Sequence, residues 1–205
     1  QDLERFINEP QVEMDPIVRA ALVHYQFETA HPFLDGNGRL GRLLITLMLI
    51  NDGVLHSCLF YPSFQFKKNR SEYYRQLTSV RERGTYEEWI EFFCNSLLES
   101  AKDSVGSLKN LVDLHNRSTA TITENLGRTA ANGQRLLGIL EEHPIVDTAF
   151  IAAQLDIGRS TASSLVKSFE ELGILRPLDE SRQRYRQYGY EEYLSILRED
   201  AEPIR

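Results

Sequence analysis

One twelve-residue stretch sets the expectations for the whole chain: His31-Pro32-Phe33-Leu34-Asp35-Gly36-Asn37-Gly38-Arg39-Leu40-Gly41-Arg42. It holds a histidine, a carboxylate, three glycines and two arginines, and an apolar run over residues 43–50 follows at once. Gly36-Asn37-Gly38 suits a tight loop, because glycine adopts backbone conformations with positive φ at little cost. The apolar run predicts a buried helix. The loop is therefore expected at the N-terminus of that helix.

Such a position is a natural anion site, since free N–H groups and the positive end of the helix dipole attract phosphate. Arg39 and Arg42 are three residues apart, so they share a helix face and can reach the same anion. Asp35 offers a hard oxygen ligand for Mg²⁺, which commonly takes one or two carboxylates together with substrate phosphates. His31 precedes the helix, where an imidazole can accept a proton from an incoming hydroxyl. The stretch thus predicts a site for phosphate chemistry.

The same residues match a known pattern. His-x-Phe-x-Asp/Glu-Gly-Asn-Gly-Arg-x-x-Arg is the signature of Fic proteins, and residues 31–42 satisfy every fixed position. The flanks over residues 15–28 and 67–74 are similar to the family as well. The chain therefore resembles the Fic family over roughly residues 1–125. This resemblance implies transfer of a nucleotide monophosphate, usually AMP from ATP, onto a Ser, Thr or Tyr hydroxyl of a protein.

The resemblance also implies roles for single residues. His31 would be the general base, and Arg42 would hold the terminal phosphate of ATP. Asp35 would bind Mg²⁺, although the same residue can simply cap the following turn. Phe33 is expected to anchor the loop in the core. The β-hairpin flap and the inhibitory helix of many Fic proteins are not evident before His31, so Arg42 is expected to lack the glutamate partner that such a helix supplies.

Bulk properties narrow the class of protein. The chain has 205 residues, 41% of them hydrophobic, and a net charge of −7, which allows one or two domains and does not suggest general nucleic-acid or membrane-surface binding. Cys58 and Cys94 are too few for a disulfide framework or a zinc set, and we interpret them as reduced core thiols. No signal peptide is visible and the apolar runs are too short to span a membrane. We therefore expect a cytoplasmic protein.

Hydrophobic periodicity predicts an all-α first domain over residues 1–125. The expected helices cover residues 15–30, 37–53, 69–83 and 85–127, with a break in the last one at Gly106 and a short helical turn within residues 54–66. A capping-box pattern, Thr85 followed by Glu88, marks the start of the long helix. The fold class is therefore mainly α.

A second domain is expected over residues 126–205, after a junction rich in Thr, Asn, Ala and Gly. The pattern predicts helices over residues 134–142, 147–155 and 158–173, strands over 174–178 and 185–188, and a last helix over 191–197. Three helices followed by a hairpin resemble a winged helix-turn-helix domain, a small α+β fold that Fic proteins often carry at the C-terminus.

The net charge of this second domain helps to distinguish DNA from protein as its binding partner. A DNA-reading helix would present polar side chains supported by basic ones on the hairpin: Arg159, Ser160, Thr161, Ser163, Ser164, Lys167, Arg182, Arg184 and Arg186. Residues 129–199 nevertheless hold 8 Lys and Arg against 11 Asp and Glu, a net of −3, whereas DNA-binding domains usually have a basic footprint. Protein recognition, or a packing role in a homodimer, is therefore favoured over DNA.

Two classes of function follow from these observations. The first is a protein adenylyltransferase that uses ATP and Mg²⁺ and modifies a protein hydroxyl, including its own. The alternative is a DNA-binding transcriptional regulator whose Fic core senses a nucleotide. Within the enzyme class, removal of AMP or use of UTP or GTP stays open, because the motif fixes the phosphates and not the base.

Overall fold

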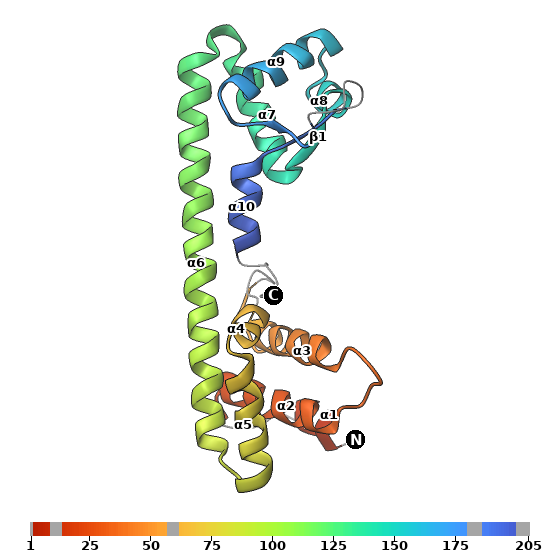
Figure 1. The fold of residues 1–205 in the computed structure, drawn as a ribbon, viewed down its shortest axis with the longest axis vertical. Coiled ribbons are helices and arrows are strands. Elements are labelled where there is room, and N and C mark those ends of the chain that lie inside the picture. The colour runs from red at the N-terminus through yellow and green to blue at the C-terminus, as the bar shows by residue number, and fades with distance from the viewer. Residues whose placement is uncertain (1, 9–13, 57–61, 180–185, 200–205) are drawn as a thin grey trace. The chain divides into compact units, whose positions relative to one another are not determined.

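The computed structural model describes residues 2–8, 14–56, 62–179 and 186–199 (Figure 1). Cys58, Arg182 and Arg184 lie outside these described residues. The chain falls into two compact units, and the division between them lies within one long helix, between Val105 and Gly106.

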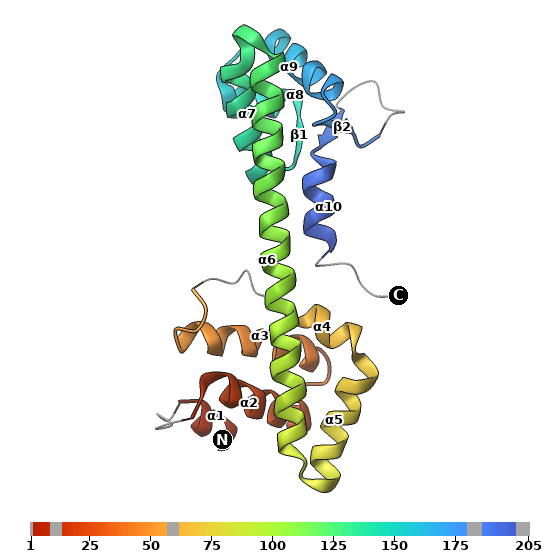
Figure 2. The same cartoon turned by 90° about the vertical axis from the view of Figure 1, so that its left-hand side faces the viewer.

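The described part of the first unit is helical throughout, which confirms the predicted all-α class. Its helices, seen in red to yellow-green in Figures 1 and 2, are α1 (Asp2–Asn8), α2 (Pro16–Ala30), α3 (Asn37–Asn51), α4 (Ser63–Lys68), α5 (Arg70–Arg83) and the first half of α6 (Tyr86–Asn125).

Helices α2 and α3 form an antiparallel pair that carries the motif between them. Asp15 caps α2, because its Oδ1 accepts the N–H groups of Ile17 and Val18 at 2.8 and 3.3 Å. Near this end of α2, Arg19 donates from Nη2 to both carboxylate oxygens of Asp52, just past α3, at 2.5 and 2.6 Å. The two side chains are only 12% and 14% exposed. This ion pair ties the start of α2 to the end of α3 and leaves the motif loop at the opposite end of the pair.

The core of the first unit is rich in aromatic residues. Trp89 is fully buried, and its indole N–H donates to the carbonyl of Ala21 at 3.0 Å, which fastens α6 to α2. Cys94 is a partly buried free thiol, and burial raises its pKa. The other core residues are Ala20, Tyr25, Ile45, Leu49, Phe66, Tyr73, Leu77, Val80, Phe93 and Leu97.

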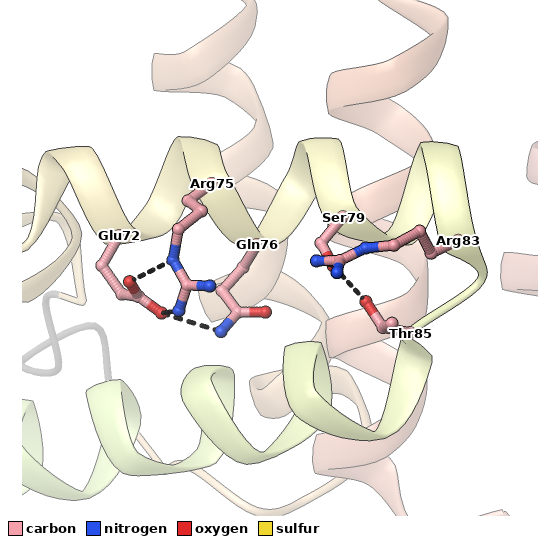
Figure 3. A network of polar contacts seen from close by, with 6 residues as sticks. All are labelled: Glu72, Arg75, Gln76, Ser79, Arg83 and Thr85. Atoms are coloured by element: carbon pink, nitrogen blue, oxygen red, sulfur yellow. Dashed lines mark hydrogen bonds and ion pairs between the residues drawn. The ribbon is translucent and has the colours of Figure 1, made fainter.

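The joint between α5 and α6 differs in detail from the expectation. Gly84 ends α5 with a positive φ of 70°. The Thr85 hydroxyl pairs with the Ser79 hydroxyl at 2.6 Å, and Arg83 donates to the same Ser79 oxygen at 2.8 Å (Figure 3). Thr85 therefore fixes the turn through α5 and does not form the predicted capping box.

Further back on α5, a second network joins the exposed side chains of Glu72 and Arg75 to the buried Gln76. Glu72 accepts hydrogen bonds from Arg75 and Gln76 within the same helix (Figure 3). These contacts lower the pKa of Glu72 through the hydrogen bonds from Arg75 and then Gln76. An exposed pair of this kind contributes little to stability.

Helix α6 continues through Gly106 without interruption, so the predicted break is wrong. A glycine within a helix costs only about 1 kcal/mol relative to alanine. Leu97 and Leu114, on either side of it, are buried in the cores of the first and second units respectively. Packing of the flanking turns therefore outweighs the local cost.

The second unit combines helices with a small sheet. After the second half of α6 come η1 (Gly127–Thr129), α7 (Ala130–Glu142), β1 (Ile145–Asp147), α8 (Thr148–Leu155), α9 (Arg159–Glu171), β2 (Arg176–Pro177), β3 (Gln187–Gly189) and α10 (Glu191–Glu199). The sheet has the order β1-β3-β2 and is antiparallel, with Tyr188 opposite both Val146 and Pro177. The hairpin was predicted but β1 was not, since three residues are too few to show strand alternation.

Within this unit, α10 lies alongside the second half of α6 in both views (Figures 1 and 2). The hydroxyls of Ser118 and Tyr190 share a hydrogen bond of 2.8 Å, and Arg117 pairs with Glu192 at 2.7 Å. Among the described residues, no helix has both the length and the apolar character needed to cross a membrane.

Candidate functional site

His31 closes helix α2 in an unusual backbone conformation. It is the C-cap residue, with φ 44° and ψ 56°, and its N–H donates to the Phe27 carbonyl at 3.0 Å. Non-glycine residues in this left-handed region are uncommon and cluster at functional sites. The side chain is exposed to solvent. The imidazole is therefore held at a fixed point of the backbone and stays accessible to a second molecule.

Asn37 fixes the loop that follows His31. Its side chain is buried, with Oδ1 accepting the Phe33 N–H at 2.9 Å and Nδ2 donating to the Phe33 carbonyl at 2.5 Å. The sequence placed Asn37 in the phosphate cradle, and the structure gives its side chain an internal bracing role. The Phe33 ring is 51% exposed, so the prediction of a core anchor is wrong: the backbone of Phe33 anchors the loop.

The N-terminus of α3 has the form expected of an anion site. Gly36 is the N-cap, with a φ of 83° and no side-chain cap. The Leu40 N–H donates to the Gly36 carbonyl at 3.0 Å. The N–H groups of residues 37–39 precede this bond, so helix geometry gives them no carbonyl one turn back. Asn37 and Gly38 are two of the three residues for which the sequence predicts phosphate binding; the third, Gly36, is the N-cap.

The two arginines of the motif have different surroundings. Arg42 donates from Nε to the Ser63 hydroxyl at 3.0 Å, and its Nη1 lies 3.0 Å from where a Cβ on Gly38 would stand. Its guanidinium therefore folds back over the first turn of α3. Arg39 is exposed and pairs with Asp35 at 3.4 Å, with side chains 77% and 94% exposed. Arg42 is thus the better-ordered of the two cations.

Two further residues complete the site, and sequence reasoning assigned neither of them a role. Glu28 lies three residues before His31, and its Oε1 is buried without a hydrogen-bond partner among the described atoms. Burial raises the pKa of this carboxyl, while the charges of Arg42 and His31 act in the opposite direction. Ser63 is buried at the start of α4. The spacing of Glu28 from His31 was the available signal for the first, and nothing near Ser63 in sequence identifies the second.

His24 shows how closely α2 and α3 approach. Its ring contacts the Gly41 carbonyl through Nδ1 and the Tyr73 hydroxyl through Nε2, both at 3.0 Å. A Cβ on Gly41 would stand 2.6 Å from Glu28 Oε1 and 3.2 Å from the His24 ring. The predicted structural role of His24 is consistent with this geometry. Gly41 is needed because two helices pack at that point with no room for a side chain.

The surroundings of Asp35 bear on its predicted role as a Mg²⁺ ligand. Its carboxylate stands in solvent, one residue before the N-cap of α3. The described residues hold no group of three or more His, Cys, Asp or Glu able to form a protein cage for a metal. One exposed carboxylate beside a phosphate site fits the way Mg²⁺ is shared between a protein and a nucleotide.

The second unit presents a polar face on α9. Its apolar face, formed by Ala162, Leu165, Val166 and Phe169, is buried in the unit's core. The residues predicted to read DNA on this helix are all exposed: Arg159, Ser160, Thr161, Ser163, Ser164 and Lys167. Lys167 pairs with Glu171 at 3.7 Å, which offsets one of the two positive charges on this face.

Part of the chain is similar in sequence to known proteins. Residues 1–49 match the Fic/DOC family. Protein adenylyltransferase fic-1 of Caenorhabditis briggsae is 34% identical over 109 residues, which are 53% of this chain and 20% of that protein. Protein adenylyltransferase Fic of Drosophila ananassae is 36% identical over 96 residues, 46% of this chain and 18% of that protein. The chain thus spans about a fifth of the length of the curated relatives it matches.

Among solved structures, a Fic family protein from Desulfovibrio desulfuricans aligns with a TM-score of 0.48 at 22% identity, covering 92% of this chain and 52% of that one. The motif lies within residues 1–49, the range of the family match, which contains α2 and most of α3. By these matches, the N-terminal part of the chain is similar to the Fic/DOC family and to the matched parts of protein adenylyltransferases.

Proposed function

We propose that this chain transfers AMP from ATP to a Ser, Thr or Tyr hydroxyl of a protein. One observation carries the proposal: a single short loop, braced by Asn37, joins an exposed histidine to a helix N-terminus. The guanidinium of Arg42 lies over the first turn of that helix. A proton acceptor and an anion site are thereby held next to each other in sequence and in a fixed backbone geometry.

The phosphates would be bound by the N-terminus of α3 and the two arginines. Gly36, Asn37 and Gly38 supply backbone N–H groups, which favour an anion together with the helix dipole. Arg42 binds the terminal phosphate, and Arg39 leaves Asp35 to contact the same chain of phosphates. Arginine suits this task because its planar fork matches phosphate oxygens.

His31 acts on the acceptor. Its imidazole takes the proton of the target hydroxyl as that oxygen forms a bond to the α-phosphorus. The bond from the α-phosphorus to the bridging oxygen breaks, and pyrophosphate leaves with the electron pair. General-base help of this kind contributes roughly 10²–10⁴-fold to the rate. Asp35 would hold Mg²⁺, which when bound offsets negative charge on the phosphates.

For the second part of the chain, we propose a winged-helix domain over residues 126–205, with the catalytic domain over 1–125. The order α7, β1, α8, α9 and the β2–β3 hairpin supports this assignment. The acidic balance of residues 129–199 supports recognition of a protein more than DNA.

The test is labelling with α-³²P ATP and Mg²⁺ in a cell lysate. His31→Ala should abolish the labelled bands and keep ATP binding. His56→Ala, which removes another exposed histidine of the same unit, should leave the bands unchanged. Bands that persist with His31→Ala would overturn the role of His31. ATP binding without any labelled band would favour the nucleotide-sensing alternative.

A further inference from the structure

The guanidinium of Arg42 is restrained on two sides before any ligand arrives. On one side Nε donates to the Ser63 hydroxyl at 3.0 Å. On the other side Nη1 lies close to the backbone of Gly38, where even a methyl group would stand 3.0 Å away. Ser63 is itself only 3% exposed, at the first residue of α4. The restraint therefore comes from a buried part of the fold and not from a flexible surface group.

The use of Nε has a consequence for the rest of the guanidinium. Arginine has five N–H donors in a planar fork. Because Ser63 accepts the Nε proton, the plane of the fork is fixed and the four donors on Nη1 and Nη2 remain for an anion. Ordering a long side chain on binding carries an entropic cost. In this chain the Arg42 side chain is already ordered by Ser63 before the ligand binds.

The surroundings also contain a competing partner for Arg42. The half-buried carboxyl of Glu28 interacts electrostatically with Arg42, yet no ion pair joins these two residues in the described part of the chain. Ser63 instead accepts the hydrogen bond of the guanidinium, and the missing side chain of Gly38 leaves room for Arg42 over the first turn of α3.

We propose that Ser63 is a positioning residue of the nucleotide site, which aims the terminal nitrogens of Arg42 at the outermost phosphate. This inference rests on the proposed binding of ATP by the motif. Ser63 does not touch the phosphate itself. It determines how strongly the phosphate chain is held and leaves the proton transfer at His31 unchanged.

The experiment is a titration of the full chain with ATP and with AMP by calorimetry. Ser63→Ala should weaken ATP binding up to about tenfold, because the Arg42 side chain must then be ordered when the ligand binds, and it should leave AMP binding unchanged. Ser63→Cys keeps the volume with a weak acceptor, so it should also weaken ATP binding. Ser96→Ala removes another buried hydroxyl of the first unit, bonded to the Phe92 carbonyl, and should bind ATP like the unchanged chain.

A double-variant cycle separates positioning from general loosening of the fold. Arg42→Lys keeps the charge but has no Nε donor, so adding Ser63→Ala to it should change ATP affinity by less than twofold. A full tenfold loss in that background, or an equal loss for ATP and AMP, would overturn the inference. ATP affinity unchanged in both Ser63 variants would overturn it and leave the proposed function standing. Absence of ATP binding by the unchanged chain would remove the proposed function and the inference together.

Discussion

His24 should make the first unit sensitive to mild acid. The Gly41 carbonyl can only accept, so Nδ1 carries the proton and Nε2 accepts from the Tyr73 hydroxyl. The side chain is 1% exposed. Burial lowers the pKa of His24 from 6.5 to about 4, against the Gly41 hydrogen bond, which raises it, and with a smaller lowering by Arg42.

The sign and size of the effect follow from this shift. The folded-state pKa lies below that of the unfolded chain, so between pH 6.5 and 4 the unfolded chain binds the extra proton and stability falls as the pH falls. Above pH 6.5 the group has no effect. A shift from 6.5 to about 4 corresponds to about 3 kcal/mol in full, of which roughly 2 kcal/mol is lost between pH 7.5 and pH 5.

The assay is urea unfolding followed by fluorescence. Trp89 is the chain's single tryptophan and stacks 6.2 Å from the His24 ring, so its emission reports on the first unit. His24→Asn removes the titrating group, and every other ionisable group is common to both proteins. The stability advantage of the unchanged chain over this variant should shrink by about 2 kcal/mol from pH 7.5 to pH 5. A constant difference would refute the reasoning, as would an NMR titration of the His24 ring with its midpoint near 6.5.

Three other predictions follow from the contacts of α2 and α3. Gly41→Ala should lower the free energy of unfolding by about 1–3 kcal/mol, because the added methyl group meets Glu28 and His24. The control Gly138→Ala, in open space on α7, should instead raise it by about 0.5–1 kcal/mol. Equal shifts in melting temperature for the two variants would contradict the packing argument. Glu28→Gln should raise the melting temperature at pH 7, because burial raises the pKa of the half-buried carboxyl and so disfavours its ionised form in the folded chain. The gain should vanish once the pH is low enough to protonate that carboxyl in the folded and the unfolded chain, and a gain that is independent of pH would exclude this explanation. Asn37→Ala should lower the free energy of unfolding by about 1–3 kcal/mol, because two hydrogen bonds to Phe33 are lost. It should also lower the rate of AMP transfer more than the affinity for ATP. An unchanged rate of AMP transfer would show that the loop does not depend on the Asn37 side chain.

Local signals in the sequence predicted most of the helices and the order of the motif. Asp15 and Gly84 mark helix ends with their own chemistry, so the expected start of α2 and end of α5 agree with the structure. The break at Gly106 was overestimated, because distant packing on both sides decides the path of α6. Strand β1 was missed because three residues carry no periodicity.

In the candidate site, too, some features follow from the local sequence and others depend on contacts between distant residues. The left-handed turn at Gly36 and the helix after it follow from residue type and pattern. The contact between Arg42 and Ser63 joins residues 21 positions apart, and no spacing rule connects them. Phe33 was misassigned because an aromatic residue in a motif looks like a core residue, whereas the loop is closed by a polar side chain, Asn37.

At His31, the residue type that best stabilises the backbone conformation differs from the one that the proposed reaction needs. A left-handed conformation costs a residue with a Cβ about 1–2 kcal/mol, and glycine avoids that cost. His31→Gly would then fold at least as well as the unchanged chain while losing the proposed base. Selection of variants by thermal stability alone would enrich inactive proteins at this position. The residue that the fold prefers here and the residue that the reaction needs are different, and a screen must measure both.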